Sequence, residues 1–445
     1  MLKRFLTLFI LFFIISSNLV FAADSSSLNI SSPSAILIDA KTGKILYEKN
    51  AYERMYPAST TKIMTAILTL ENCDLSDTAI ASYNAVTSIP IGYNTVNLEI
   101  GEELTIEQLL HLLLIPSANV AANILAEHIA GSIESFSSMM NTKAVSIGCK
   151  DTNFTNPYGL HDENHYTTAY DLALMGQYAM KNDIFRSIVK KTSYILPPTN
   201  KYSENDRVFN TTNDLIRPNS STRADNYYYK NAIGIKTGYT SYAKNCLVSA
   251  ASSDGLEFIA VILGAEQSPE GLSNRFLESK ALLEFGYDNY TVRKLKEADS
   301  IVKQIDVKNA TRDTKHLDLL IQEDIDVLTE KQNIDKIILP EITLNENIEA
   351  PIAKGDVLGS ITYTVEDIPY TTNLIAGADV EKSSFLNYVI TIIFISQYSW
   401  KIKRVLDFFL CGCAVVRQKL PLLNPHMPET ITPGYRTSKT AQREV

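Results

Sequence analysis

The stretch Pro57-Ala-Ser-Thr-Thr-Lys-Ile-Met-Thr-Ala66 opens the segment that decides the fold. Apolar side chains recur at helical spacing within and just after it: Ile63, Met64, Ile67 and Leu68. This spacing predicts an amphipathic helix over residues 59–71, with Ser59 at its N-terminal end. Ser59 and Lys62 are three residues apart and would share one helix face, so the lysine amine can reach the serine hydroxyl.

The Ser59-x-x-Lys62 pair has the residue types that a serine nucleophile needs. A serine hydroxyl attacks poorly until a base removes its proton. A lysine can be that base when burial and neighbouring charges lower its pKa. Alone the pair is a weak signal, because Ser-x-x-Lys recurs by chance and Ser59 could simply cap the helix.

Two more short motifs lie far downstream. Ser117-Ala-Asn119 follows a proline between two apolar segments, where a hydroxyl could relay a proton and an amide could hold a substrate carbonyl. Lys236-Thr-Gly238 lies on a predicted strand, where a cation and a hydroxyl can hold a carboxylate and a glycine lets a ligand approach. Together with Ser59-x-x-Lys62, in this order, they form the motif set of penicillin-binding proteins and class A β-lactamases.

The pattern around these motifs predicts an α+β fold. Apolar runs on either side of Lys41-Thr-Gly43 predict a hairpin. Further helices are expected at residues 108–114, 120–130, 169–180 and 276–285, and further strands at 233–237, 246–251 and 258–263. A polar loop is expected at 199–231. This order suits a sheet in which the first hairpin pairs with late strands while helices cover it.

The sequence resembles the low-molecular-mass penicillin-binding proteins that are serine-type D-alanyl-D-alanine carboxypeptidases (peptidase S11-like). Besides the three motifs, the similar stretches are residues 39–49, 156–160, 168–171, 234–240 and 275–283. The resemblance implies a β-lactamase/transpeptidase-like antiparallel sheet with covering helices. Val120 and Tyr158 depart from residues that are frequent in the family, which leaves the substrate detail open.

The resemblance also implies roles for five of the residues. Ser59 would be the acyl nucleophile and Lys62 its base. Ser117 would shuttle the proton, Asn119 would orient Lys62 and the peptide, and Lys236 would tune Ser117 electrostatically. The implied reaction removes the terminal D-alanine from peptidoglycan stem pentapeptides without a metal or cofactor, and β-lactam antibiotics would inhibit it.

Four further residues would bind the substrate. Thr237, with Arg275 nearby, would hold the terminal carboxylate, and Gly238 would leave room for the peptide. The backbone N–H groups of Ser59 and Tyr239 would form the oxyanion hole, which is usually worth several kcal/mol.

The two ends of the chain predict export and membrane attachment. Lys3 and Arg4, an apolar run and Val20-Phe-Ala22 are typical of a signal peptide over residues 1–22, with an uncleaved anchor as the alternative. Residues 383–400 have no charged side chain, and lysines and an arginine follow at once. This predicts a C-terminal anchor over 384–400 that spans the membrane or lies in its interface.

Length and composition limit the number of domains and the classes of function that the chain can have. The 445 residues suit two or three domains, and a net charge of −9 argues against a general nucleic-acid binder. Five cysteines make no disulfide framework and are expected to be buried thiols. The expected parts are a signal peptide 1–22, a catalytic domain 23–290, a small all-β domain 291–380, an anchor 384–400 and an unassigned basic tail 401–445.

Three other functions compete with this hypothesis. A β-lactamase needs a glutamate-positioned water, yet Glu163 is the only glutamate between residues 148 and 174 and lacks the expected context. A Ser-His-Asp hydrolase would show a Gly-x-Ser-x-Gly elbow, which is absent. A non-catalytic wall-binding or sensor homologue would not need all the motif residues. His161 and His165 could suggest a metal site, but solvated side chains are the preferred interpretation.

Overall fold

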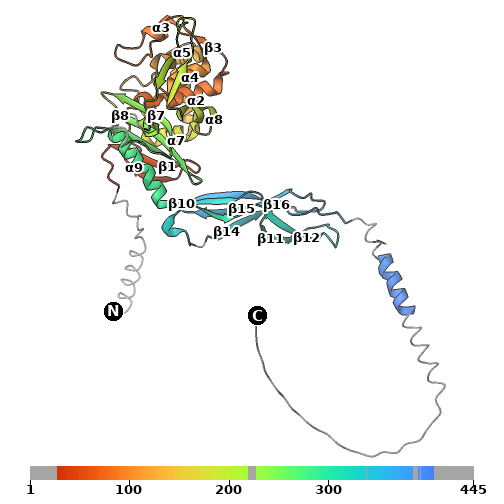
Figure 1. Cartoon of the computed structure of the whole chain (residues 1–445). Helices are drawn as coiled ribbons and strands as arrows, with labels where there is room; N and C mark the ends of the chain where they lie inside the picture. Colours follow the sequence, from red (N-terminus) through yellow and green to blue (C-terminus); the bar gives the residue numbers. More distant parts are fainter. Residues whose placement is uncertain (1–27, 219–226, 337, 384–388, 391, 405–445) are drawn as a thin grey trace, which may run out of the picture. The chain divides into compact units, whose positions relative to one another are not determined.

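The computed structural model describes residues 28–218, 227–336, 338–383, 389–390 and 392–404 (Figure 1). The predicted signal peptide, residues 384–388 and 391 of the predicted anchor, and residues 405–445 of the basic tail lie outside the described residues. The described residues divide into two compact units: those up to 298, within 323–343 and within 360–372 form one, and those within 299–322, within 344–359 and from 373 onward form the other. The predicted boundary at 290/291 stays a prediction.

A five-stranded antiparallel sheet forms the centre of the first unit, with strand order β2-β1-β9-β8-β7. The strands are β1 (Ser34–Asp39), β2 (Ile45–Lys49), β7 (Ala232–Thr240), β8 (Lys244–Ser253) and β9 (Leu256–Ala265). The first hairpin therefore pairs with a late strand, as predicted, with Ile36 opposite Val261. Asp254 and Gly255 make the β8–β9 turn with positive φ angles.

Both faces of this sheet are covered, which explains why every residue of β1 is buried. Ile36 and Ile38 face one apolar cluster, which includes side chains of α2 (Lys62–Asn72) and α7 (Ala169–Ala179). Ala35 and Leu37 face another, which includes Leu282 and Leu283 of α9 (Asn274–Asn289). Alternate side chains of one strand thus enter two different cores.

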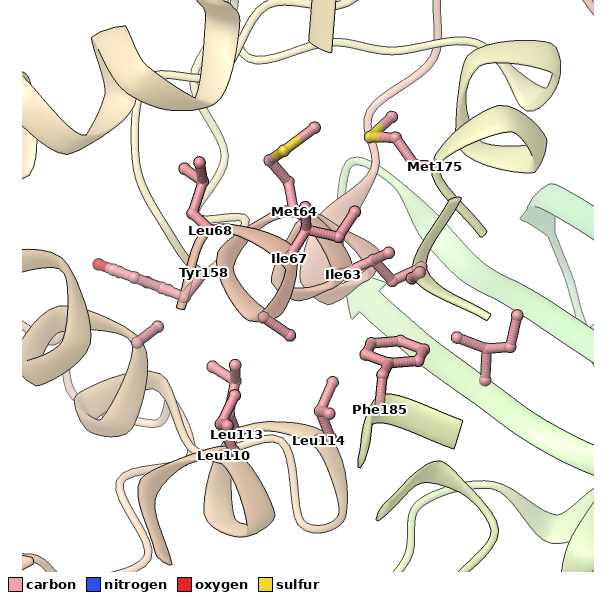
Figure 2. Close-up of a cluster of buried hydrophobic side chains, with 14 of the residues drawn as sticks. Ile63, Met64, Ile67, Leu68, Leu110, Leu113, Leu114, Tyr158, Met175 and Phe185 are labelled. Carbon is pink, nitrogen blue, oxygen red and sulfur yellow. The ribbon is translucent and has the colours of Figure 1, made fainter. Parts of the chain in front are cut away.

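Helix α2 is the central helix, and apolar side chains surround it. Figure 2 shows Ile63, Met64, Ile67 and Leu68 of α2 next to Tyr158 and to side chains from three other helices: Leu110, Leu113, Leu114, Met175 and Phe185. The remaining helices are α3 (Tyr83–Thr87), α4 (Ile106–Leu114), α5 (Asn119–Ala130), α6 (Ile133–Ile147) and α8 (Asp183–Val189). This packing fixes the position of the turn that precedes α2.

Some local predictions need correction. The α-helix begins at Lys62, and residues Ala58–Thr61 form a 3₁₀ turn (η2), so Ser59 precedes the helix instead of starting it. The expected loop 199–231 contains β6 (Arg207–Asn210), which pairs with β5 (Ser193–Leu196), and a short 3₁₀ turn η3 (Asp214–Ile216). Helices α6 and α8 were not predicted, because α6 is polar on most of its surface and α8 is short.

Between α9 and residue 383 the described chain consists mainly of β-strands, as the sequence predicts, with one short 3₁₀ turn at Lys331–Asn333. Strand β10 (Tyr290–Lys296) pairs with β13 (Ile325–Glu330), and a five-stranded sheet has the order β11-β12-β16-β15-β14. Its strands are β11 (Ile301–Asp306), β12 (His316–Ile321), β14 (Pro340–Leu344), β15 (Val357–Val365) and β16 (Ile368–Ala376). Of the expected run 337–339, Ile338 and Leu339 precede β14 without joining a strand.

Residues 392–404 are helical, and several apolar side chains of this segment are exposed: Ile392, Ile393, Phe394, Ile395, Tyr398 and Trp400. Among the described residues, no helix has the length and apolarity needed to cross a membrane.

Candidate active site

The turn η2 holds Ser59 at the entrance to the central helix. Its backbone is fixed because the Thr60 hydroxyl donates to the Pro57 carbonyl at 2.7 Å. Thr60 is fully buried, whereas Ser59 is only partly buried and lines a cleft. The serine hydroxyl is therefore exposed to a ligand while the turn around it is held in place.

Lys62 lies beneath Ser59, and its side chain is completely buried. Its Nζ is 2.8 Å from Ser59 Oγ, 2.6 Å from Asn119 Oδ1 and 3.1 Å from the Tyr158 carbonyl oxygen. Burial, followed by the positive charge of Lys236, holds the pKa of Lys62 well below its usual value. A lysine that loses its proton readily can accept one from the hydroxyl that it contacts.

Ser117 lies in the turn between α4 and α5, and Asn119 is the first residue of α5. Ser117 has a φ of +67°, which bends the chain so that Asn119 begins α5 facing Lys62. Asn94, from a separate loop, braces this turn: its carbonyl accepts from Asn119 N at 2.8 Å, and its Nδ2 donates to the Pro116 carbonyl at 2.5 Å. The short predicted motif therefore depends on a residue more than 20 positions upstream.

Strand β7 forms the opposite wall. Lys236 is 1 % exposed and donates to the Thr237 carbonyl at 2.8 Å. Burial, with Arg275 as a second cause, lowers the pKa of Lys236 to about 7. Position 238 requires a glycine even without a ligand, because a Cβ there would lie 2.9 Å from the Pro57 carbonyl oxygen. The glycine lets β7 pass next to the serine turn.

Arg275, in the first turn of α9, completes this wall. Its Nη1 donates to the Gly238 carbonyl at 3.1 Å, so the guanidinium lies behind the Lys236-Thr-Gly238 segment. Tyr239, the next residue along β7, is 62 % exposed at the cleft.

These walls enclose a cleft of about 420 Å³. Seven of the residues predicted from sequence line it: Ser59, Ser117, Asn119, Thr237, Gly238, Tyr239 and Arg275. Lys62 and Lys236 are buried next to it. Sequence reasoning missed several lining residues from other segments: Gly92, Tyr93, Asn94, Tyr158, Gly159 and Thr212.

The loop with Tyr158 and Gly159 is shaped by Asn156. The Asn156 Oδ1 accepts from the backbone N–H groups of Tyr158, Gly159 and Leu160 at 3.3, 2.8 and 2.9 Å. This leaves the Tyr158 carbonyl free to accept from Lys62. Gly159 has a φ of +87°, and a Cβ there would lie only 1.8 Å from the Ala58 carbonyl oxygen. The Asn-Pro and Gly in the sequence signal a turn, but not this close contact.

The prediction that His165 is solvated is wrong. His165 is 1 % exposed, and burial lowers its pKa to about 4, so it is neutral near pH 7. Its Nδ1 accepts from Thr155 N at 3.0 Å, so Nε2 carries the proton and donates to Thr61 Oγ1 at 2.8 Å. His161 stacks on Tyr242. Within the described ranges, no group of three or more His, Cys, Asp or Glu side chains is arranged to hold a metal ion.

The expectation of buried thiols holds for Cys149 and Cys246, whose pKa values burial raises to about 12 and about 11. Cys73 is partly buried and also free.

Comparison with known proteins agrees with this geometry. The family model of the peptidase S11 D-alanyl-D-alanine carboxypeptidases matches residues 21–267. The model of the penicillin-binding protein 5 C-terminal domain matches residues 290–382. Fold and matches define a penicillin-binding serine enzyme. Within that class, the chain belongs to the D-alanyl-D-alanine carboxypeptidase family, which confirms the predicted family and activity.

Relatives cover most of the chain. The D-alanyl-D-alanine carboxypeptidase DacF of Bacillus subtilis is 34 % identical over 80 % of this chain and 87 % of its own length. The crystal structure of PBP3 from Streptococcus pneumoniae, a peptidoglycan synthesis regulatory factor, has a TM-score of 0.66 at 26 % identity and covers 80 % of this chain and 100 % of that one. Penicillin-binding protein 5 from Haemophilus influenzae has a TM-score of 0.60 at 27 % identity, with 80 % and 98 % covered.

Proposed function

We propose that Ser59 is the residue acylated when this carboxypeptidase removes the terminal D-alanine of a stem pentapeptide. One observation carries the assignment: a cleft-facing serine hydroxyl is 2.8 Å from the amine of a fully buried lysine whose pKa is lowered. When the Lys62 amine is neutral, the hydrogen bond reverses and the Ser59 hydroxyl donates to Nζ.

In the proposed acylation, Ser59 Oγ attacks the carbonyl carbon of the penultimate D-alanine and its proton passes to Lys62. The N–H groups of Ser59 and Tyr239 donate to the oxyanion. Ser117 then delivers a proton to the leaving nitrogen and takes the proton held by Lys62, so that the C–N bond breaks, D-alanine departs, and the Lys62 amine is neutral again. Water next attacks the ester with Lys62 as base, which releases the shortened peptide and restores Ser59.

The substrate is oriented by its terminal carboxylate. In this proposal Thr237 and Arg275 bind that carboxylate, with Lys236 supplying a positive field when protonated. Asn119 holds Lys62 and the peptide. The proximity of Arg275 to the Gly238 carbonyl and the position of Thr237 in the cleft support this arrangement.

The test is acylation by a fluorescent penicillin combined with D-alanine release from a stem pentapeptide. Wild type should label stoichiometrically and release D-alanine, whereas Ser59→Ala should do neither. Equal labelling of both proteins would overturn the assignment of Ser59. Rapid hydrolysis of the drug would instead support a β-lactamase, and labelling without D-alanine release would support a wall-binding homologue.

We further propose that the protein is exported and attached to the outer face of the cytoplasmic membrane by residues 384–400, with 23–290 as the catalytic and 291–380 as the β-rich domain. The uncharged stretch followed by basic residues supports the attachment. The full chain should sediment with membranes and resist a high-salt wash, and a chain ending at residue 383 should stay in the supernatant. Equal partitioning of the two chains would contradict the anchor.

A further inference from the structure

Thr212 connects the two walls of the cleft, although no sequence motif points to it. It lies between β6 and η3 and lines the cleft. Its Oγ1 is 2.5 Å from Thr237 Oγ1 on β7. Its backbone N–H donates to the Ile115 carbonyl at 3.3 Å, at the end of α4 just before the Ser117 turn. Thr212 is thus held from both sides.

The surroundings of Thr212 suit an anion. Arg275 uses Nη1 for the Gly238 carbonyl, while its buried Nε has no hydrogen-bond partner among the described residues. The guanidinium, which also lines the cleft, therefore has at least one N–H that no described protein group satisfies. Asp214, two residues from Thr212, is partly buried; burial raises its pKa, and the positive charges of Arg217 and Arg275 oppose this rise. Arg217 Nη1 lies 3.5 Å from Asp214 Oδ1, so this acid has a cationic partner of its own.

The number of protons on the Thr212–Thr237 hydroxyl pair shows what the pair can donate to a ligand. Two hydroxyls 2.5 Å apart hold two protons, and one of them lies in the bond between the oxygens. The other proton has no acceptor within the pair, so it can be donated to a ligand in the cleft. A carboxylate oxygen accepts such a proton strongly because it is charged. A neutral carboxamide in its place accepts a hydrogen bond more weakly. It also brings N–H donors, for which the arginine has no acceptor.

We propose that Thr212 is a specificity-determining residue for a free terminal carboxylate: it donates to Thr237 Oγ1 and so directs the Thr237 proton to the substrate. This inference rests on the proposed function, since it concerns the carboxylate end of the same substrate. Thr212 selects a peptide with a free C-terminal acid over the same peptide with a C-terminal amide.

The experiment compares diacetyl-L-Lys-D-Ala-D-Ala with its C-terminal carboxamide as substrates of the full chain. Thr212→Val keeps the branched shape and removes the hydroxyl. It should lower kcat/KM for the free acid about tenfold, the upper end of what one hydrogen bond contributes, because the Thr237 proton is no longer directed to the carboxylate. It should change kcat/KM for the amide less than about twofold. Thr212→Ser should restore selectivity to near the wild-type value.

A matched control exists in the β-rich part of the chain. Thr362 and Thr371 form a similar hydroxyl pair at 2.8 Å, and neither lines the cleft. Thr362→Val should leave both substrates unaffected. Thermal unfolding of each variant shows whether it folds, and Thr212→Ala repeats the measurement if Thr212→Val does not.

An equal loss on both substrates, or no loss on either, would overturn the role of Thr212. The second result with normal wild-type turnover leaves the proposed function intact. If wild type releases no D-alanine from the free acid, the proposed function fails and this inference fails with it.

Discussion

At the scale of single residues, several basic side chains lie close together at the cleft, and burial disfavours their charged forms. Lys62 and Lys236 are both fully buried, and the lowered pKa of each has burial as its main cause and a neighbouring cation as the next. Arg275 is that neighbour for Lys236. Such an arrangement costs folding free energy, and buried groups with shifted pKa values are typical of functional sites, which fits the proposed role of Lys62 as the base.

The first prediction concerns Lys236. An unfolded lysine keeps its proton up to pH 10.5, whereas folded Lys236 loses it above about 7, so the unfolded state binds more protons in between. Wild type should therefore gain stability as pH rises from about 7 to 10.5, by at most about 1.4 kcal/mol per pH unit from this residue. Lys236→Met should flatten this rise and increase stability at pH 7 while reducing acylation.

Urea unfolding at several pH values measures this effect. The exposed Lys150 supplies the control, since Lys150→Met should follow the wild-type pH dependence. Parallel curves for wild type and Lys236→Met would show that the buried amine contributes nothing to the pH dependence.

At the scale of elements, the position of η2 depends on one strand and one loop, each of which approaches it through a glycine. Gly238 on β7 and Gly159 in the loop before α7 both lie against residues 57–59. Any side chain at either position would displace the serine turn or the loop itself. The geometry of the proposed nucleophile Ser59 is therefore set by backbone contact between distant segments as much as by the helix that follows it.

The second prediction compares two glycines with similar backbone angles. Gly131 has a φ of +76°, and an added Cβ there would meet open space. Gly131→Ala should therefore cost about 1 kcal/mol of stability and leave acylation unchanged. Gly159→Ala, at φ +87°, adds a collision with the Ala58 carbonyl and should slow penicillin acylation more than about 100-fold. Equal acylation rates in the two variants would mean that η2 tolerates the displacement.

At the scale of the whole molecule, every residue of the proposed site lies between positions 57 and 275. The part of the chain after α9 nevertheless contributes to a core of the first unit, because Tyr290 and Leu328 join the cluster around Leu282. The residues proposed for catalysis therefore end at Arg275, whereas residues that contribute to the core of the first unit continue beyond α9.

The third prediction follows from this distribution. A fragment of residues 28–289 should still be acylated by penicillin, but its thermal midpoint should be several degrees below that of residues 28–383 because apolar surface is exposed. Fluorescent labelling and circular dichroism measure the two properties, with Ser59→Ala in the fragment as the labelling control. A folded fragment that does not label would show that the later strands support the cleft itself.

The sequence by itself determined the local features: the α2 periodicity, the first hairpin and the three motifs, whereas the roles of the motif residues came only from the resemblance to the family. Local spacing suffices for the Ser59–Lys62 contact because residues three apart are neighbours on a helical turn. Only the tertiary structure revealed Thr212, Gly159 and the burial of His165. Their contacts join positions 25 to about 100 residues apart, and such contacts arise from the packing of whole elements, which leaves no periodic signal in the chain.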